Sequence, residues 1–194
     1  SSDVCSSDLT PYYNKPTQEG LFQHYKAIAE STDLPIIVYN VPGRAGVNIE
    51  PSTLARLATL PNIIGVKEAS GNISQMVDIC KLVPESFIVL SGDDALTLPL
   101  MAVGGQGVIS VASNQIPAEM VAMVDAALRG DFAGARAIHN RNLPLMQVNF
   151  VEANPVPVKS AMAMMGARRL GFQTTVSPQT AASMAFQAQT ALGS

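Results

Sequence analysis

The chain has 194 residues, of which 14% are charged and 47% are hydrophobic, and its 12 Lys and Arg against 15 Asp and Glu give a net charge of −3. This composition excludes a disordered chain and argues against a nucleic-acid binder that relies on a basic surface. No apolar run approaches the roughly 20 residues that a membrane-spanning helix needs. Cys5 and Cys80 are too few for a disulfide framework, and no signal-peptide pattern opens the chain. We therefore expect a globular cytoplasmic protein with no membrane or nucleic-acid partner.

The first nine residues read SSDVCSSDL and show neither hydrophobic periodicity nor a sustained apolar run. A repeated polar unit of this kind is typical of a disordered terminus or of foreign sequence. We expect residues 1–9 to be one or the other, with the folded part beginning at Thr10.

Short apolar runs rich in β-branched residues follow at loosely regular intervals. They predict strands at residues 35–40, 63–68, 87–92 and 107–111. Runs that are apolar on both faces are typical of a parallel sheet that is covered on both sides.

The segments between these runs have helical spacing and helix-start signals, such as Pro51 at a first turn. Helices are predicted at residues 18–31, 51–60, 72–82 and 94–103, and then without intervening strands at 116–128, 131–148, 155–166 and 178–191. Strands alternating with helices indicate an α/β fold with a parallel sheet and outer helices. A helical region follows it.

Lys67 ends the run Ile63–Ile64–Gly65–Val66, where a cation is costly unless it is paired or functional. Alternation places Lys67, Gly65 and Ile63 on one face, and Gly65 would leave room there for a small ligand. Desolvation would favour the free amine that forms an imine with a ketone. The alternative is a strand-end lysine that reaches solvent or pairs with Glu68.

Tyr39 ends the preceding strand, close to the expected position of Lys67, and a phenol there can accept and return a proton. It can equally be a buried aromatic that closes the end of the strand. Arg44 follows in a loop between Gly43 and Gly46, where a guanidinium could hold a carboxylate or simply be solvated.

Other polar motifs indicate contacts or turns. Tyr12 and Tyr13 form an aromatic pair that suggests a contact surface, although packing under a neighbouring loop is equally plausible. Asp93 and Asp94 are best interpreted as helix-capping residues, because no further ligands with metal-site spacing accompany them. We predict no metal site.

The motifs together resemble one family. TPYYNKP, YNVPGRAG, GVKEASGN, LSGDD and GGQGVISV occur in this order, and the set resembles the dihydrodipicolinate synthase family of class I aldolase-like (β/α)8 barrels. The resemblance implies a partial TIM barrel, namely its last four strands with their helices over residues 10–129, followed by a C-terminal helical region over 130–194.

The resemblance also implies roles for individual residues. Lys67 would form a Schiff base with pyruvate, Tyr39 would transfer protons, and Tyr13 would reach across a subunit interface into the partner's site. Arg44 would hold the carboxylate of aspartate semialdehyde, and Ile109 and Gly92 would line the pyruvate site. The reaction would serve lysine and diaminopimelate biosynthesis without metal or organic cofactor, in a homotetramer built as a dimer of dimers.

The chain departs from the family pattern in two respects. Ala45 stands where many members have Thr. A Gly-Thr-Thr-Gly-Glu segment of the family's N-terminal half does not occur in this chain, which is also shorter than the about 250 residues of a complete barrel. We therefore expect the chain as given to be truncated, with little or no turnover.

Two other functions compete with this one. N-acetylneuraminate lyases and 2-keto-3-deoxy sugar acid aldolases share the lysine chemistry, but the resemblance implies that they lack the arginine at Arg44. The other possibility is an inactive fragment or a non-enzymatic interaction subunit.

Overall fold

The computed structural model describes residues 6–166, and its central element is a five-stranded parallel sheet in the order β1-β2-β3-β4-β5. The strands are β1 (Ser6–Leu9), β2 (Ile36–Asn40), β3 (Ile63–Glu68), β4 (Ile88–Ser91) and β5 (Gly107–Val108). Each strand pairs in parallel with the next one in the sequence, the order of consecutive βα units. The expected α/β class and parallel sheet are confirmed.

Strand β1 differs from the disordered start that the sequence suggested for residues 1–9. Ser6 to Leu9 pair in parallel with Ile36 to Tyr39, so Leu9 lies beside Tyr39 in the register. A segment without an apolar run can form a strand here because its backbone pairs with β2.

The pairing register between β2 and β3 shifts by one residue between Ile36 and Ile37. Ile36 lies opposite Ile63, whereas Ile37 lies opposite Gly65. The prediction that Ile63 shares a face with Lys67 is therefore wrong, because Ile63 belongs to the buried core with Ile36 and Val66. A bulge of this kind reverses the facing of residues on one side of it.

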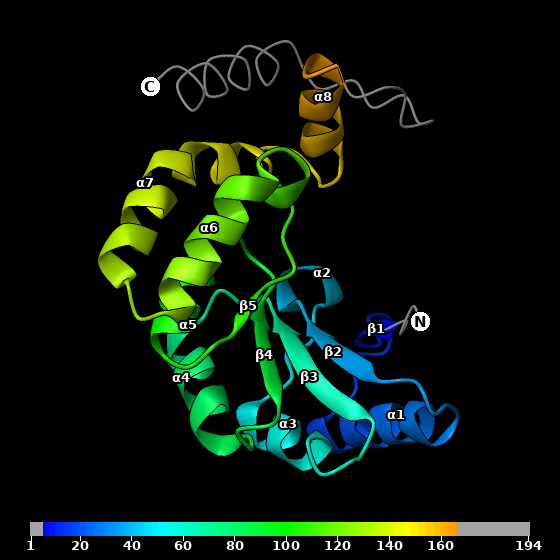
Figure 1. Cartoon of the computed structure of the whole chain (residues 1–194). Helices are drawn as coiled ribbons and strands as arrows, with labels where there is room; N and C mark the ends of the chain where they lie inside the picture. The colour runs from blue at the N-terminus through cyan, green and yellow to red at the C-terminus, as the bar shows by residue number, and fades with distance from the viewer. Residues whose placement is uncertain (1–5, 167–194) are drawn as a thin grey trace. The chain divides into compact units, whose positions relative to one another are not determined.

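Helices cover the core face of this sheet. They are α1 (Gln18–Glu30), α3 (Pro51–Leu57), α4 (Ile73–Leu82) and α5 (Thr97–Ala102), whereas the one-turn helix α2 (Pro42–Ala45) follows the carboxyl end of β2. Figure 1 shows α1, α3, α4 and α5 following one another around the outside of the strands, and these helices contact each other in that order. Their apolar residues form one core with the strands, including Leu21, Tyr25, Leu54, Leu57, Met76 and Ile79.

Side-chain caps fix where two of these helices begin. The side chain of Thr17 accepts a hydrogen bond from the backbone N–H of Gly20 at the start of α1, and Asn72 accepts one from Gln75 at the start of α4. The short helix α2 was not predicted. It begins at Pro42, directly after β2, and ends at Gly46 with a φ of 66°, a left-handed conformation that glycine adopts readily.

The chain divides into two units after Ile109. The sequence placed the barrel boundary at residue 129 instead, so the helix at 117–128 falls in the second unit. There α6 (Pro117–Leu128) packs against α7 (Phe132–Val148). The second unit also contains η1 (Ala112–Asn114) and α8 (Val156–Met164). The helix predicted at 178–191 lies outside the described residues.

Two buried side-chain amides in the helical unit form a reciprocal pair of hydrogen bonds. Nε2 of Gln115 donates to Oδ1 of Asn149 at 3.1 Å, and Nδ2 of Asn149 donates to Oε1 of Gln115 at 2.8 Å. Both side chains are buried, so each amide satisfies a polar group that water does not reach.

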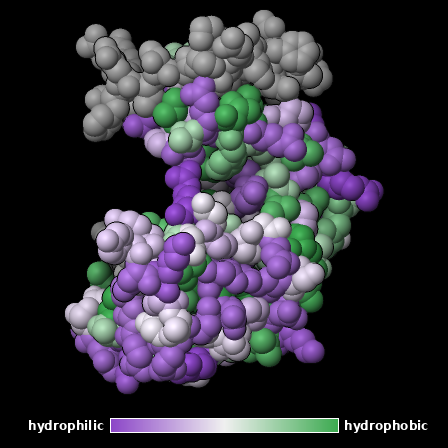
Figure 2. Space-filling view, turned by 180° about the vertical axis from the view of Figure 1, so that it is seen from behind, coloured by the Kyte–Doolittle hydropathy of each residue, from purple (hydrophilic) through white to green (hydrophobic). Residues whose placement is uncertain are grey.

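Part of the surface of the N-terminal unit is strongly polar. Figure 2 shows mainly hydrophilic side chains over the part of this unit that contains α1. Glu19 and Arg56 form an ion pair of 2.9 Å on this exposed surface. Among the described residues, none of the helices is long and apolar enough to cross a membrane.

Candidate active site

Lys67 and Tyr39 come together at the carboxyl end of the sheet. They are register partners on β3 and β2, and the Nζ atom of Lys67 lies 4.0 Å from the centroid of the Tyr39 ring. Both side chains are half-buried on the face opposite the helix-packed core. An ammonium over an aromatic face is attracted by the ring, so the two side chains hold each other in place.

The environment of Lys67 lowers the pKa of its amine relative to that of an exposed lysine. Burial lowers the pKa of Lys67, and the positive charge of Arg44 lowers it further, while the negative charge of Asp94 acts in the opposite direction. Desolvation is the largest cause, because a half-buried ammonium loses part of its hydration. A larger fraction of the amine is then free to attack a carbonyl at neutral pH than in an exposed lysine.

The environment of Tyr39 favours the neutral phenol. Burial raises the pKa of Tyr39, and Arg44 partly offsets this effect. The phenol therefore keeps its proton near neutral pH.

Gly92 makes room for the Lys67 side chain. A Cβ atom at Gly92 would lie 3.2 Å from both Cγ and Cε of Lys67 and 2.7 Å from Cβ of Ala69. The backbone N–H of Gly92 donates to the carbonyl of Glu68 at 2.7 Å, which holds this loop against β3. Gly92 thus belongs to the site by its lack of a side chain.

Gly65 has a different role from the one that the sequence suggested. A Cβ atom there would lie 2.5 Å from the backbone oxygen of Ile88 and 2.9 Å from its Cβ atom. The absent side chain allows β3 and β4 to approach each other. It does not leave space for a ligand, so that prediction is wrong.

Arg44 and Ile109 border the same end of the sheet. Arg44 is exposed on α2, which follows β2 directly, and its charge acts on both Lys67 and Tyr39. Ile109 follows β5, is half-buried, and its backbone N–H donates to the carbonyl of Ser91 at 2.9 Å. The parallel topology accounts for this gathering, because carboxyl ends of parallel strands meet at one edge.

Tyr13 lies apart from this group. It is 93% exposed in the segment between β1 and α1, next to Tyr12, which is 72% exposed. Within residues 6–166, no hydrogen bond or ring contact joins Tyr13 to Lys67 or Tyr39. Two adjacent exposed tyrosines are typical of a contact surface.

Sequence reasoning missed the polar residues that flank the pair. Glu68 does not pair with Lys67 but is fully buried on the opposite face, where Oε2 accepts a hydrogen bond from Nδ2 of Asn40 at 2.9 Å. Asp94, interpreted as a capping residue, is 1% exposed and acts electrostatically on Lys67. Strand alternation alone could have separated Glu68 from Lys67.

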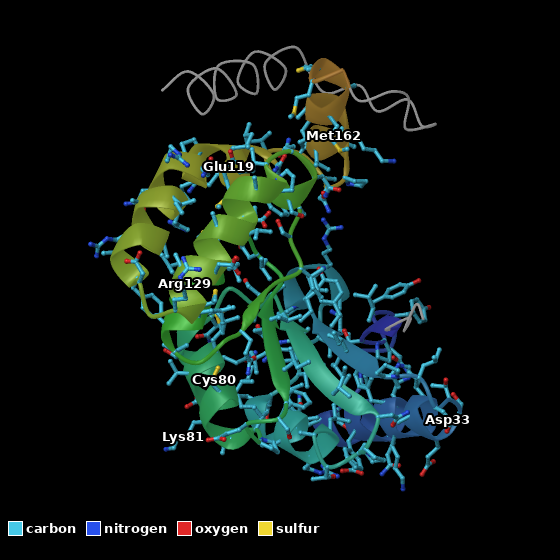
Figure 3. The ribbon with its side chains drawn as sticks, viewed as in Figure 1. Asp33, Cys80, Lys81, Glu119, Arg129 and Met162 are labelled. Carbon is cyan, nitrogen blue, oxygen red and sulfur yellow. The ribbon has the colours of Figure 1, made fainter. Side chains whose placement is uncertain are left out.

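A pocket of about 250 Å³ lies elsewhere, at the amino ends of β4 and β5. Its lining includes Cys80, Phe87, Val89 and Gln106 but not Lys67. Cys80 and its neighbour Lys81 belong to the last turn of α4 (Figure 3). Burial raises the pKa of the Cys80 thiol, which makes it a poor nucleophile. The described residues contain no cluster of three or more His, Cys, Asp or Glu suited to a metal ion.

Comparison with known proteins identifies the family of the chain. The model of the dihydrodipicolinate synthetase family matches residues 3–190. The chain belongs to this family. The match includes the segments that carry Tyr39, Lys67 and Ile109.

Curated relatives carry a consistent name. The 4-hydroxy-tetrahydrodipicolinate synthase of Koribacter versatilis is 63% identical over 157 residues, which are 81% of this chain and 52% of that protein. The synthase of Syntrophus aciditrophicus is 58% identical over 158 residues, or 81% of this chain and 54% of that protein. The chain thus spans about half the length of these dihydrodipicolinate synthetase relatives.

Solved structures of the dihydrodipicolinate synthetase family show the same fold. The synthase of Methylacidiphilum fumariolicum SolV has a TM-score of 0.91 and 43% identity, covering 95% of this chain and 63% of that one. A chloride-inhibited synthase of Acinetobacter baumannii complexed with pyruvate has a TM-score of 0.92 and 40% identity, covering 96% of this chain and 65% of that one. The α/β fold is therefore part of a (β/α)8 barrel, as expected.

Proposed function

We propose that this chain carries the Schiff-base site of a 4-hydroxy-tetrahydrodipicolinate synthase, which condenses pyruvate with aspartate semialdehyde. The observation that carries the proposal is the half-buried Lys67 amine, with Nζ 4.0 Å from the ring centroid of Tyr39 at the carboxyl end of a parallel sheet. The relative complexed with pyruvate supports the identity of the first substrate.

The chemistry begins with attack of the neutral Lys67 amine on the C2 carbonyl of pyruvate. The carbonyl oxygen leaves as water when the C=N bond forms, and Tyr39 supplies and recovers protons during this exchange. Loss of a methyl proton gives an enamine, whose carbon attacks the aldehyde of aspartate semialdehyde. The amine of that substrate then displaces Lys67, which closes the ring and restores the free lysine.

The neighbouring residues would bind the substrates. Arg44 carries the exposed guanidinium that we assign to the carboxylate of aspartate semialdehyde, since this group forms paired hydrogen bonds with carboxylates. Ile109 and Gly92 border the space beside Lys67 and would contact pyruvate.

Tyr13 would complete the site of a partner subunit in a homotetramer made of two dimers. Its 93% exposure supports an intermolecular role, because it has no place in the site of its own chain. We assign the enzyme to lysine and diaminopimelate biosynthesis in the cytoplasm. No metal or organic cofactor is needed, because the lysine imine is itself the electron sink.

Reductive trapping tests the proposal. The chain is incubated with pyruvate and borohydride, which adds hydride to the imine carbon and leaves a carboxyethyl group on the lysine. Peptide mass analysis should find this group at Lys67, at a low rate, and not at Lys26 or Lys81. The K67R variant, which keeps the positive charge but has no nucleophilic amine, should remain unlabelled.

Two results would overturn this assignment. Labelling at another lysine, or none at all, would exclude Lys67 as the imine-forming residue. Release of pyruvate from sialic acid, with no turnover of aspartate semialdehyde, would instead assign the site to a sugar-acid lyase.

A further inference from the structure

We propose that Glu68 is a positioning residue: with Asn40, Asn48 and Gln75 it forms a buried polar cluster that fixes the ends of β2 and β3 and thereby the placement of Lys67 against Tyr39. This inference rests on the proposed function of Lys67. The four residues are called the polar clamp below.

Glu68 is the centre of the polar clamp. It has no exposed surface, and its carboxylate accepts hydrogen bonds from Nδ2 of Asn40 at 2.9 Å and from the backbone N–H of Ser70 at 2.6 Å. Nε2 of Gln75 lies at the limit of hydrogen bonding, 3.5 Å from Oε2. Each of these contacts is a donation to an oxygen, which suits a carboxylate and no isosteric apolar group.

Asn40 joins the two strands at the position after the reactive pair. It is the register partner of Glu68, as Tyr39 is of Lys67. Nδ2 of Asn40 donates to Glu68 and also to Oδ1 of Asn48 at 3.0 Å, while Oδ1 of Asn40 accepts from the backbone N–H of Ile49 at 3.0 Å. The amide therefore uses both of its ends, which leaves it a single orientation.

The clamp is anchored outside the sheet. Asn48 and Gln75 form a reciprocal pair, with Nδ2 of Asn48 2.7 Å from Oε1 of Gln75 and Nε2 of Gln75 3.1 Å from Oδ1 of Asn48. Gln75 belongs to α4, and Asn48 precedes α3. The strand ends are thus tied to one helix and to the segment that leads into another.

A purely stabilising role does not require this arrangement. Elsewhere the same face of the sheet is filled by apolar residues such as Val38 and Val66, which bury surface without the cost of desolvating a carboxylate. The polar clamp instead fixes the relative positions of the strand ends. A fully hydrogen-bonded network allows one arrangement of its side chains, whereas apolar packing allows several. A misplacement of about 1 Å at a reacting group can cost on the order of 100-fold in rate.

Two variants and a matched control test the proposal in the full chain. N40A removes the central donor without changing charge, and E68Q replaces an acceptor oxygen by a donor at constant size. N62A is the control: Nδ2 of Asn62 donates to the carbonyls of Ala29 and Thr32 at 2.9 and 2.8 Å, at the amino end of β3, far along the strand from Lys67.

Three measurements accompany each variant: thermal stability, the rate of pyruvate trapping at Lys67, and the pH midpoint of Lys67 acylation by an amine-reactive reagent. We expect all three variants to lower thermal stability. N40A and E68Q should slow trapping by about tenfold or more, whereas N62A should not. N40A should also raise the acylation midpoint, because a loosened strand end lets water reach the ammonium.

The outcomes separate the two proposals. If the wild-type chain traps pyruvate and N40A and E68Q trap it as fast as N62A does, the clamp only stabilises the fold and this inference is wrong. A midpoint that falls in E68Q and is unchanged in N40A would show that Glu68 acts through its charge, which also overturns it. If the wild type does not trap pyruvate, the proposed function fails, and the acylation midpoints still test the positioning.

Discussion

The amine of Lys67 faces the ring of Tyr39 across two neighbouring strands, with Nζ 4.0 Å from the ring centroid. The ring shields one side of the amine from water. Because the two residues share a register position, any change that moves β2 relative to β3 changes this distance.

Removing the Tyr39 hydroxyl should separate shielding from proton transfer. Y39F keeps the ring over Lys67, so we expect an unchanged fold and an acylation midpoint of Lys67 close to that of the wild type. Pyruvate trapping should slow by about 100-fold, within the range for loss of a general acid. Trapping at the wild-type rate would contradict a proton-transfer role. Y39A removes the ring as well as the hydroxyl. It should therefore change the pH midpoint of Lys67 acylation in addition to slowing pyruvate trapping.

Adding a methyl group at Gly92 should displace the Lys67 side chain. G92A places a Cβ atom 3.2 Å from Cγ and Cε of Lys67 and 2.7 Å from Cβ of Ala69. We expect a loss of about 1–3 kcal/mol in the free energy of unfolding, measured by urea denaturation, together with slower trapping. G43A is the control, since nothing lies within 4 Å of a Cβ atom there. Equal effects of the two substitutions would refute the role of Gly92.

Neutralising Arg44 should shift the titration of the site. Arg44 lowers the pKa of both Lys67 and Tyr39, so R44Q should raise the pH midpoint of Lys67 acylation. Since the guanidinium is exposed, the difference should shrink in 1 M salt, where the screening length is about 3 Å. R56Q removes an arginine that contacts Glu19 and Phe22 instead and should leave the midpoint unchanged. A fall of the midpoint in R44Q would contradict the electrostatic argument.

A further prediction concerns the pH midpoint of Lys67 acylation in the wild-type chain. Because burial lowers the pKa of Lys67, its acylation should reach half-maximum at a lower pH than that of a free model lysine. A folded-state pKa below the unfolded value also means that protonation disfavours folding. The contribution of Lys67 to stability is therefore greatest above the unfolded pKa and is lost as the pH falls through the folded pKa. An acylation midpoint at or above that of the model lysine would contradict the lowered pKa of Lys67.

The helical unit offers an independent test of buried polar pairing. Q115L or N149L alone leaves the other amide without its partner and should cost about 1–3 kcal/mol. The double variant should recover much of this loss, giving a coupling energy in a double-mutant cycle. Additive losses, measured by thermal unfolding, would show that the two amides do not depend on each other.

Hydrophobic pattern predicted strands at 35–40 and 63–68, which correspond to β2 and β3, and the helices around them, because these segments bury continuous apolar surface. It could not predict β1, whose pairing depends on the neighbouring strand, nor the register shift that turns Ile63 into the core. Lys67 and Tyr39 were predictable as strand-end residues. Glu68 and Asn40 were not recognised, since their importance comes from hydrogen bonds between segments 28 residues apart.

The strand order β1-β2-β3-β4-β5 has a consequence for how the chain acquires its structure. Within residues 6–166, every strand pairing joins consecutive strands, so none of them has to wait for a remote segment of the polypeptide. During synthesis, each emerging strand can be added to a surface that the preceding strand already presents, and its helix can then cover the new apolar face. Each pairing closes a loop of one βα unit, which costs less chain entropy than a pairing between remote segments would. Until the next strand is synthesised, the outer edge of the newest strand is open to other chains.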